Sequence, residues 1–389
     1  MITKKHILPI IVIAQFCCTS LWFATNGVMN SVILEYQLEA TAIGWLTSAV
    51  QFGFIAGTLL FALFTISDRF SPSKVFFISA LCASLFNFCF ILQSNNLSYI
   101  LIFRFLTGFF LAGIYPVGMK IATDYFDKGL GKSLGFLVGA LVLGTALPHL
   151  IKDFFASTSW KFVIVSTSIL SVIGGLLILL FVKDGPYRKR NNIFDLKTIT
   201  TVFKKSEFKK AAFGYFGHMW ELYTFWAFVP IMLFSYNKIH SNLTIDISLL
   251  SFLIIGIGSI SCIFAGYISQ KLGVRKTAFN FLLGSFVCCL IVPFSFLFDS
   301  QVLFVLFLII WSFLVIGDSP MFSTLVAQNV DSKDKGTALT IVNCIGYSIT
   351  ILSILIITQL NITLQSNYIY MLLGLGPFLG LIVLGRKTA

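Results

Sequence analysis

The feature that most constrains this chain is a succession of long apolar segments. A helix rises about 1.5 Å per residue, so roughly 20 apolar residues cross the hydrocarbon core of a bilayer. Because strand-like alternation is absent, we predict an all-α integral membrane protein with twelve spanning helices. The predicted spans cover residues 7–34, 42–66, 75–94, 98–119, 133–151, 160–182, 211–235, 246–268, 277–297, 301–325, 336–359 and 366–385.

The distribution of basic residues predicts how these spans are oriented. The chain is 57% hydrophobic and 11% charged, whereas soluble domains carry roughly 25% charged residues. Lys and Arg fall on the side that holds both termini, except Arg104, Lys152, Lys161 and Lys238. Cytoplasmic loops are enriched in basic residues, so both termini are predicted to be cytoplasmic. The net charge of +12 then reflects topology and argues against a nucleic-acid partner.

The longest hydrophilic interval divides the predicted spans six and six. It opens with KDGPYRKRNN, where Asp, Gly and Pro stop a helix. We predict an N-terminal six-helix half over residues 1–183, a cytoplasmic linker over 184–210 and a C-terminal six-helix half over 211–389. Two such halves are the architecture in which internal repeats build a central transport site.

The stretch Gly214–Pro230, GYFGHMWELYTFWAFVP, carries ionisable residues in the middle of a predicted span. His218 and Glu221 are three residues apart and share one helix face. A carboxylate at membrane depth costs about 2.5–3.5 kcal/mol on insertion scales, so such a residue normally faces inward and is used. Glu221 is the first candidate for a proton-coupling group, and Asp318 is the second.

Each of these residues also has a structural interpretation. Glu221 could be paired permanently with Arg104 or a lysine, and His218 could be an interhelical hydrogen-bonding residue. Asp318 could cap a helix that is broken near Pro320. His149, at the outer end of the fifth span, is either a gate residue or an interfacial one.

Two loops and one span resemble motifs of the major facilitator superfamily, and the resemblance extends over the full length of the chain. The loop ISDRFSPSK (66–74) and its second copy GYISQKLGVRK (266–276) match the signature loop in part, although Phe64 and Ser71 stand where glycines are usual. The span RFLTGFFLAGIYPVGMK (104–120) resembles the family's R-x-x-x-G motif. Ala140 stands where the proline of the proton-antiporter pattern is usual, which weakens an antiport interpretation.

The resemblance implies roles for residues of this sequence. Asp68, Arg69, Lys74, Gly273 and Arg275 would form a conformational latch, although Arg69 and Lys74 could be plain topology anchors. Lys120 and Asp124 are expected to be loop charges. In the family, spans 1, 4, 7 and 10 line the central cavity, and span 11 contributes further polar residues here. The candidate solute-binding residues are Gln15, Trp22, Asn26, Arg104, Tyr115, His218, Trp220, Tyr223, Asn343 and Tyr347.

Two of these candidate groups carry further expectations. Gln15, Thr19, Trp22 and Asn26 have the spacing of a single helical stripe. Arg104 stays charged, so it needs an anionic partner, a cluster of carbonyls or water, unless it snorkels to the outer surface.

The sequence favours a transporter over an enzyme. It contains no phosphate-binding loop, and its eight cysteines lack metal-ligand spacing. No cofactor and no metal are expected. The preferred function is proton-coupled symport of a small polar organic solute, anionic ones included, by a monomer in the bacterial inner membrane. Proton-driven efflux of drugs or secreted metabolites is the alternative, and a non-transporting membrane receptor or scaffold is the rival from a different class.

Overall fold

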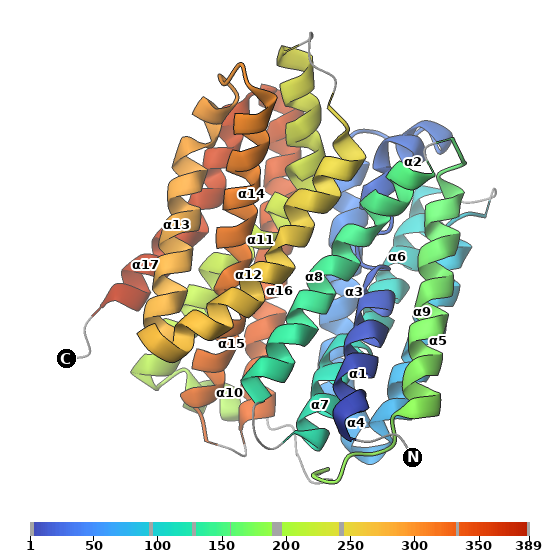
Figure 1. The fold of residues 1–389 in the computed structure, drawn as a ribbon, viewed down its shortest axis with the longest axis vertical. Helices are drawn as coiled ribbons and strands as arrows, with labels where there is room; N and C mark the ends of the chain where they lie inside the picture. Colours follow the sequence, from blue (N-terminus) through green and yellow to red (C-terminus); the bar gives the residue numbers. More distant parts are fainter. Residues whose placement is uncertain are drawn as a thin grey trace. The chain divides into compact units, whose positions relative to one another are not determined.

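The computed structural model describes residues 4–92, 96–126, 130–155, 157–188, 197–240, 245–331 and 334–386. These residues form helices and turns, and no strand occurs among them. The chain divides into two compact units, Met1–Phe194 and Asp195–Ala389, which are coloured blue to green and yellow-green to red in Figure 1. Part of the predicted linker, residues 189–196, lies outside the described residues.

The first unit is built from long helices that pack in pairs. α3 packs along α6, α5 along α9, and α1 against both α8 and α9. The elements are α1 (Lys4–Thr19), η1 (Asn26–Val28), α2 (Met29–Glu35), α3 (Ala42–Leu63), α4 (Ile66–Arg69), α5 (Pro72–Cys89), α6 (Leu97–Leu111), α7 (Tyr115–Tyr125), α8 (Leu130–Phe154) and α9 (Lys161–Phe181).

The second unit is organised around its longest helix. This helix, α11, packs against α16 and α17, while α12 packs along α14 and α13 contacts α14 and η2. The elements are α10 (Lys197–Val202), α11 (Ser206–Ile239), α12 (Ile247–Leu272), α13 (Val274–Ser295), α14 (Gln301–Gly317), α15 (Ser319–Gln328), α16 (Lys335–Leu364), η2 (Asn367–Gly374) and α17 (Leu375–Gly385).

Ten helical stretches within the described residues are long and apolar enough to cross a bilayer. They correspond to ten of the predicted spans. The span predicted over 211–235 lies inside α11, whose Trp, Tyr, His and Glu residues make it less hydropathic than the other ten. The span predicted over 7–34 is divided into shorter elements, of which His6–Thr19 is an apolar helix.

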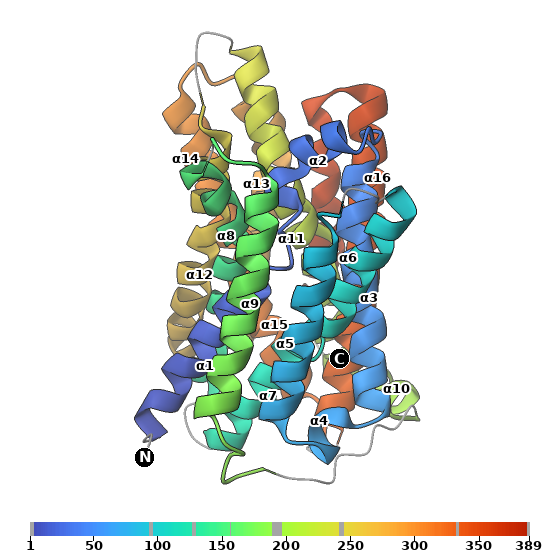
Figure 2. The ribbon, with the colours of Figure 1, turned by 90° about the vertical axis from the view of Figure 1, so that its right-hand side faces the viewer.

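The break in the first predicted span is the main correction to the expected pattern. α1 ends at Thr19, residues 20–25 form turns, and the chain resumes as η1 and α2. Figure 2 shows α1 and α2 as separate helices joined by a non-helical stretch of blue chain. The single helical stripe expected from Gln15 to Asn26 is therefore wrong, because Trp22 and Asn26 lie beyond the end of α1.

Glycines set the close approach of α3 and α6. A Cβ on Gly108 would lie 2.0 Å from the Val50 carbonyl oxygen, and one on Gly53 would lie 1.9 Å from the Phe105 carbonyl oxygen. Small residues at such positions let membrane helices pack backbone against backbone. Because Gly108 is four residues after Arg104, the same helix face carries the contact and the buried cation.

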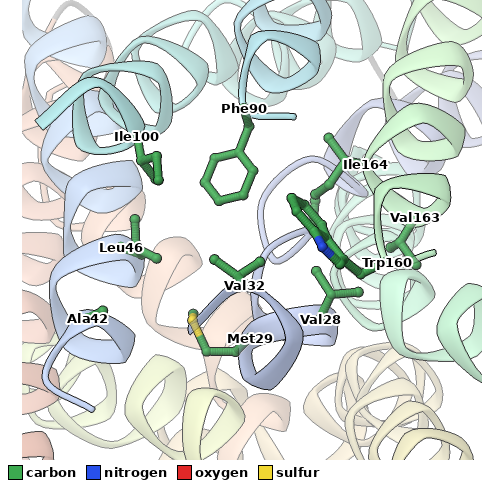
Figure 3. Close-up of a cluster of buried hydrophobic side chains, with 11 residues drawn as sticks. Val28, Met29, Val32, Ala42, Leu46, Phe90, Ile100, Trp160, Val163 and Ile164 are labelled. Atoms are coloured by element: carbon green, nitrogen blue, oxygen red, sulfur yellow. The ribbon is translucent and has the colours of Figure 1, made fainter. Parts of the chain in front are cut away.

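A compact hydrophobic cluster joins α2, α3, α5, α6 and α9. Figure 3 shows Phe90, Val32 and Trp160 directed into its centre. The Trp160 indole N–H donates to Glu35, and the Lys161 ammonium lies 2.6 Å from the other oxygen of that carboxylate. The bond from Lys161, with that from Trp160, lowers the pKa of Glu35. The pair therefore ties the end of α2 to the start of α9.

Candidate functional site

Glu221 is fully buried in the middle of α11 and lies within reach of donors from two other helices. Its Oε1 accepts hydrogen bonds from the Trp311 indole N–H (2.6 Å) and the Cys289 thiol (3.3 Å), and its Oε2 accepts one from the Ser285 hydroxyl (2.9 Å). Trp311 belongs to α14, and Ser285 and Cys289 belong to α13. Donors on both oxygens can hold an ionised carboxylate in an apolar interior.

The Ser285 hydroxyl has a second acceptor within reach. Its Oγ lies 3.1 Å from the Leu282 carbonyl oxygen as well as 2.9 Å from Glu221 Oε2. A hydroxyl donates one hydrogen and accepts through two lone pairs. Ser285 can therefore donate to an ionised Glu221, or donate to Leu282 and accept from a protonated Glu221, without displacement of either side chain.

His218 and Asp318 form a second buried polar pair in the same unit. His218 Nδ1 lies 2.8 Å from Asp318 Oδ1, and both side chains are fully buried. Asp318 is the single residue between α14 and α15, and its side chain makes no capping hydrogen bond to α15. Asp318 thus holds the N-cap position of a helix broken near Pro320, as one interpretation expected, but without a side-chain cap. His218 Nε2 and Asp318 Oδ2 have no hydrogen-bond partner within the described part of the chain.

The other predicted residues of this unit bond within it. The Tyr223 and Tyr347 hydroxyl oxygens are 2.8 Å apart and join α11 to α16. The Trp220 indole N–H donates to the Leu372 carbonyl (2.9 Å), so its polar edge is directed at η2. Asn343 is half-buried on α16. The contacts of Trp220 and Tyr223 fix α11, which carries Glu221 and His218, against η2 and α16.

In the first unit, Arg104 is fully buried on α6 and bonds to oxygens near the break in the first span. Its guanidinium donates to the carbonyls of Leu21 (3.2 Å) and Trp22 (2.6 Å) and to Asn87 Oδ1 (3.1 Å). Of the environments expected for Arg104, the carbonyl cluster is the one observed. Broken helices at membrane depth are tolerated where such donors satisfy the freed carbonyls. No described ion pair includes Arg104 or Glu221.

The remaining predicted residues of the first unit surround the same break. Asn26 Nδ2 donates to Thr47 Oγ1 on α3 (2.9 Å), and the Trp22 and Phe54 rings lie 4.7 Å apart. Gln15 is buried on α1 with both amide atoms unpaired among the described residues. Tyr115 is half-buried at the start of α7.

In the first unit, Asp68 of the predicted latch pairs with a residue outside the predicted set. Asp68 is bonded to Lys120 of α7 (2.9 Å), and Lys120 also lies 3.6 Å from Asp124. Lys120 and Asp124 are thus more than loop charges. Arg69 and Lys74 are exposed. The ion pair between Asp68 and Lys120 therefore connects α4 with α7.

Arg188 closes the same end of the first unit. It donates to the carbonyls of Asp68 (3.1 Å) and Phe70 (2.6 Å) and pairs with Asp184. Asp184 in turn accepts a hydrogen bond from the Ser71 hydroxyl (2.6 Å). The segment after α9 is therefore fastened to the loop that precedes α5.

The second copy of the motif connects three helices of the second unit. Gly273 has φ +84 between α12 and α13, a conformation that favours glycine. Arg275 lies 3.1 Å from Glu207 at the start of α11 and donates to the Leu384 carbonyl at the end of α17 (2.6 Å). Arg275 thus fastens the ends of α11 and α17 to α13.

Sequence reasoning missed several residues that complete these groups. Ser285 and Cys289 lie in a span that was not expected to line the site, and small residues of this kind usually fill helix interfaces. Lys120 was expected to be a loop charge, and Glu207 was not singled out. The one available signal was Trp311, a polar-edged ring in a predicted cavity-lining span.

The chain is similar to known transporters in both sequence and fold. The sequence model of the family described as Major Facilitator Superfamily matches residues 11–354. The crystal structure of a mutant of the nucleoside transporter NupG superimposes with a TM-score of 0.73 over 98% of both chains at 15% sequence identity. That likeness supports the fold.

Two bacterial transport proteins align with a shorter part of the sequence. The niacin transporter NiaP of Acinetobacter baylyi is 30% identical over 162 residues, which is 35% of this chain and 36% of that protein. The benzoate transport protein of the same species is 29% identical over 130 residues, 32% of this chain and 26% of that protein. The chain thus aligns with 36% of the length of the first relative and 26% of the length of the second.

Proposed function

This chain belongs to the major facilitator superfamily, and we propose that it is a proton-coupled symporter of small aromatic carboxylates. The observation that carries the proposal is Glu221, a fully buried carboxylate in α11 with donors to both oxygens. A carboxyl group in such surroundings can alternate between charged and neutral forms as access to it changes. The coupling proton would bind at Oε2, where Ser285 can switch from donor to acceptor.

His218 and Asp318 are proposed as the secondary proton-binding pair. Their facing atoms are 2.8 Å apart, and His218 Nε2 and Asp318 Oδ2 are unpaired within the described residues. A proton or a solute hydrogen bond could be added at these two unpaired atoms. Buried polar groups without partners cost free energy, so an occupant that pairs with them is favoured. Tyr223 and Tyr347 would hold α11 against α16 during the transport cycle.

Arg104 supports an anionic solute. It is a buried cation whose acceptors in the first unit are two carbonyls and one amide oxygen. These neutral oxygens leave its formal charge uncompensated, and an anionic solute nearby would offset that charge. The two named relatives transport niacin and benzoate by name, and both of these solutes are aromatic rings that carry a carboxylate.

The orientation and the surroundings of the protein are part of the same proposal. The excess of Lys and Arg on one side of the predicted spans supports cytoplasmic termini and twelve crossings. The bacterial relatives support a location in the inner membrane. Alternating access would release and re-form the contacts of Asp68 with Lys120 and of Arg275 with Glu207.

Uptake by proteoliposomes tests this function. Labelled benzoate, nicotinate, nicotinamide and uridine are offered with an inward proton gradient, and again after a protonophore has collapsed it. The acids also cross lipid unaided in their neutral form, so protein-free liposomes are subtracted. We expect gradient-dependent accumulation of benzoate or nicotinate. Accumulation driven by an opposite gradient would indicate efflux, and uptake of none of these solutes would overturn the proposed substrate class.

A further inference from the structure

The segments at the break in the first span carry several buried polar side chains with unpaired atoms. Thr25, Asn26, Ser48, Gln51 and His149, which we call the break cluster, are each at most 8% exposed. Each has at least one buried side-chain nitrogen or oxygen without a hydrogen-bond partner among the described residues. Since buried polar atoms in folded proteins are nearly always paired, five such residues are a candidate binding site for a polar group.

Gln51 faces the break from α3, and Ser48 lies one helical turn before Gln51 on the same helix. Thr47 and Phe54 are seven residues apart, and both contact the first span: Thr47 accepts from Asn26 (2.9 Å), and the Phe54 ring lies 4.7 Å from the Trp22 ring. Gln51 lies one helical turn from each of them on the same face. Its amide carries both donors and acceptors, and neither its nitrogen nor its oxygen is paired within the described chain.

His149 lies on α8, directly after the residue that η1 contacts. η1 lies so close to α8 that a Cβ on Gly27 would be 3.0 Å from Pro148, the residue before His149. The unpaired Thr25 hydroxyl and Asn26 Oδ1 stand on the break itself. The five residues thus come from three segments of the first unit that direct contacts join.

We propose that the break cluster is the site that hydrogen-bonds the carboxylate end of the transported solute, with Gln51 as its main contact. The Trp22 and Phe54 rings would border the aromatic part, and Arg104, which donates to the Leu21 and Trp22 carbonyls of the break, would supply the compensating charge. A planar aromatic acid needs these three elements: donors, a flat apolar border and a cation. This inference rests on the proposed function.

The test compares binding with transport in three variants. Gln51→Leu keeps the volume and removes the amide, Ser48→Ala removes one hydroxyl, and Thr358→Val removes a similarly buried, unpaired hydroxyl from α16 of the second unit. Half-saturation for benzoate is measured by counterflow, and the rise in unfolding temperature caused by saturating benzoate is measured in detergent.

We expect Gln51→Leu to raise the half-saturation concentration at least tenfold and to reduce the benzoate-induced rise in unfolding temperature, with the rate at saturation within about twofold of wild type. Ser48→Ala should raise the half-saturation concentration about threefold, and Thr358→Val should leave that concentration unchanged. An unchanged half-saturation in Gln51→Leu would assign the cluster to water and overturn the inference, as would equal losses in Thr358→Val. Failure of the wild type to transport any aromatic acid would instead refute the proposed function.

Discussion

Gly108→Ala tests whether the packing of α6 on α3 sets the position of Arg104. The added Cβ would lie 2.0 Å from the Val50 carbonyl oxygen, whereas ordinary contacts begin near 3.4 Å. The helices would have to separate by about 1.4 Å, because the obstructing atom is backbone and no rotamer can move it. Overpacking of this kind costs about 1–3 kcal/mol. We expect the upper end of that range, since the shift also disturbs the bonds from Arg104 to Leu21 and Trp22.

The unfolding temperature in detergent provides the assay. The cysteines of the described structure are free, and six of the eight are buried, so a thiol-reactive dye reports unfolding without a label. A cost near 3 kcal/mol corresponds to a fall of roughly 5–10 °C. Gly135→Ala is the matched control, because nothing lies within 4 Å of its added Cβ on α8.

Two results would refute this reasoning. An unfolding temperature for Gly108→Ala equal to that of wild type would mean that the helix pair is not as close as described. A similar fall in Gly135→Ala would mean that any added methyl group disturbs the protein. Gly53→Ala, which meets the Phe105 carbonyl oxygen at 1.9 Å, should reproduce the loss from the opposite helix.

Three further predictions concern the charged contacts. Because the pKa of Glu35 is lowered by Lys161, its contribution to stability is present above its unfolded pKa and is lost as the pH falls through the folded value. The free energies of unfolding of wild type and Glu35→Gln should therefore differ by about 0.5 kcal/mol near pH 7, discounted for exposure, and converge near pH 3. Convergence at high pH instead would contradict the assignment. Arg275→Ala should lower the unfolding temperature more than Lys276→Ala, its exposed neighbour on α13, and equal effects would remove its fastening role. Trp311→Phe should reduce gradient-driven uptake at least tenfold and leave the unfolding temperature at the wild-type value. Undiminished uptake in this variant would exclude the indole N–H from the proton site.

The helices were largely predictable from the sequence because membrane insertion imposes length and hydropathy on every span. The three-residue spacing of His218 and Glu221 was enough to predict that they lie on one face of the same helix. The break after Thr19 did not follow, since neither Gly nor Pro occurs between Thr19 and Asn26. Its freed carbonyls are satisfied by Arg104, a residue more than eighty positions away. Such tertiary hydrogen bonds leave no local pattern.

The candidate site was predictable in its charges and not in the residues that support them. A carboxylate in an apolar segment is recognisable from sequence, because its cost demands a partner. The residues that bond to it, Ser285 and Cys289, have ordinary uses at any helix interface, so their role depends on which helix faces α11. The latch illustrates the same limit: Asp68 was identified from its motif, and its partner Lys120 only from the fold.

The central claim is that Glu221 carries the coupling proton, and counterflow in Glu221→Gln tests it most directly. Glutamine resembles the protonated carboxyl in shape and charge but cannot release a proton. The account predicts that exchange of labelled for unlabelled benzoate continues in proteoliposomes while accumulation driven by a proton gradient is lost. Accumulation at the wild-type level in Glu221→Gln would contradict it, and so would the loss of both activities in a variant that unfolds at the wild-type temperature.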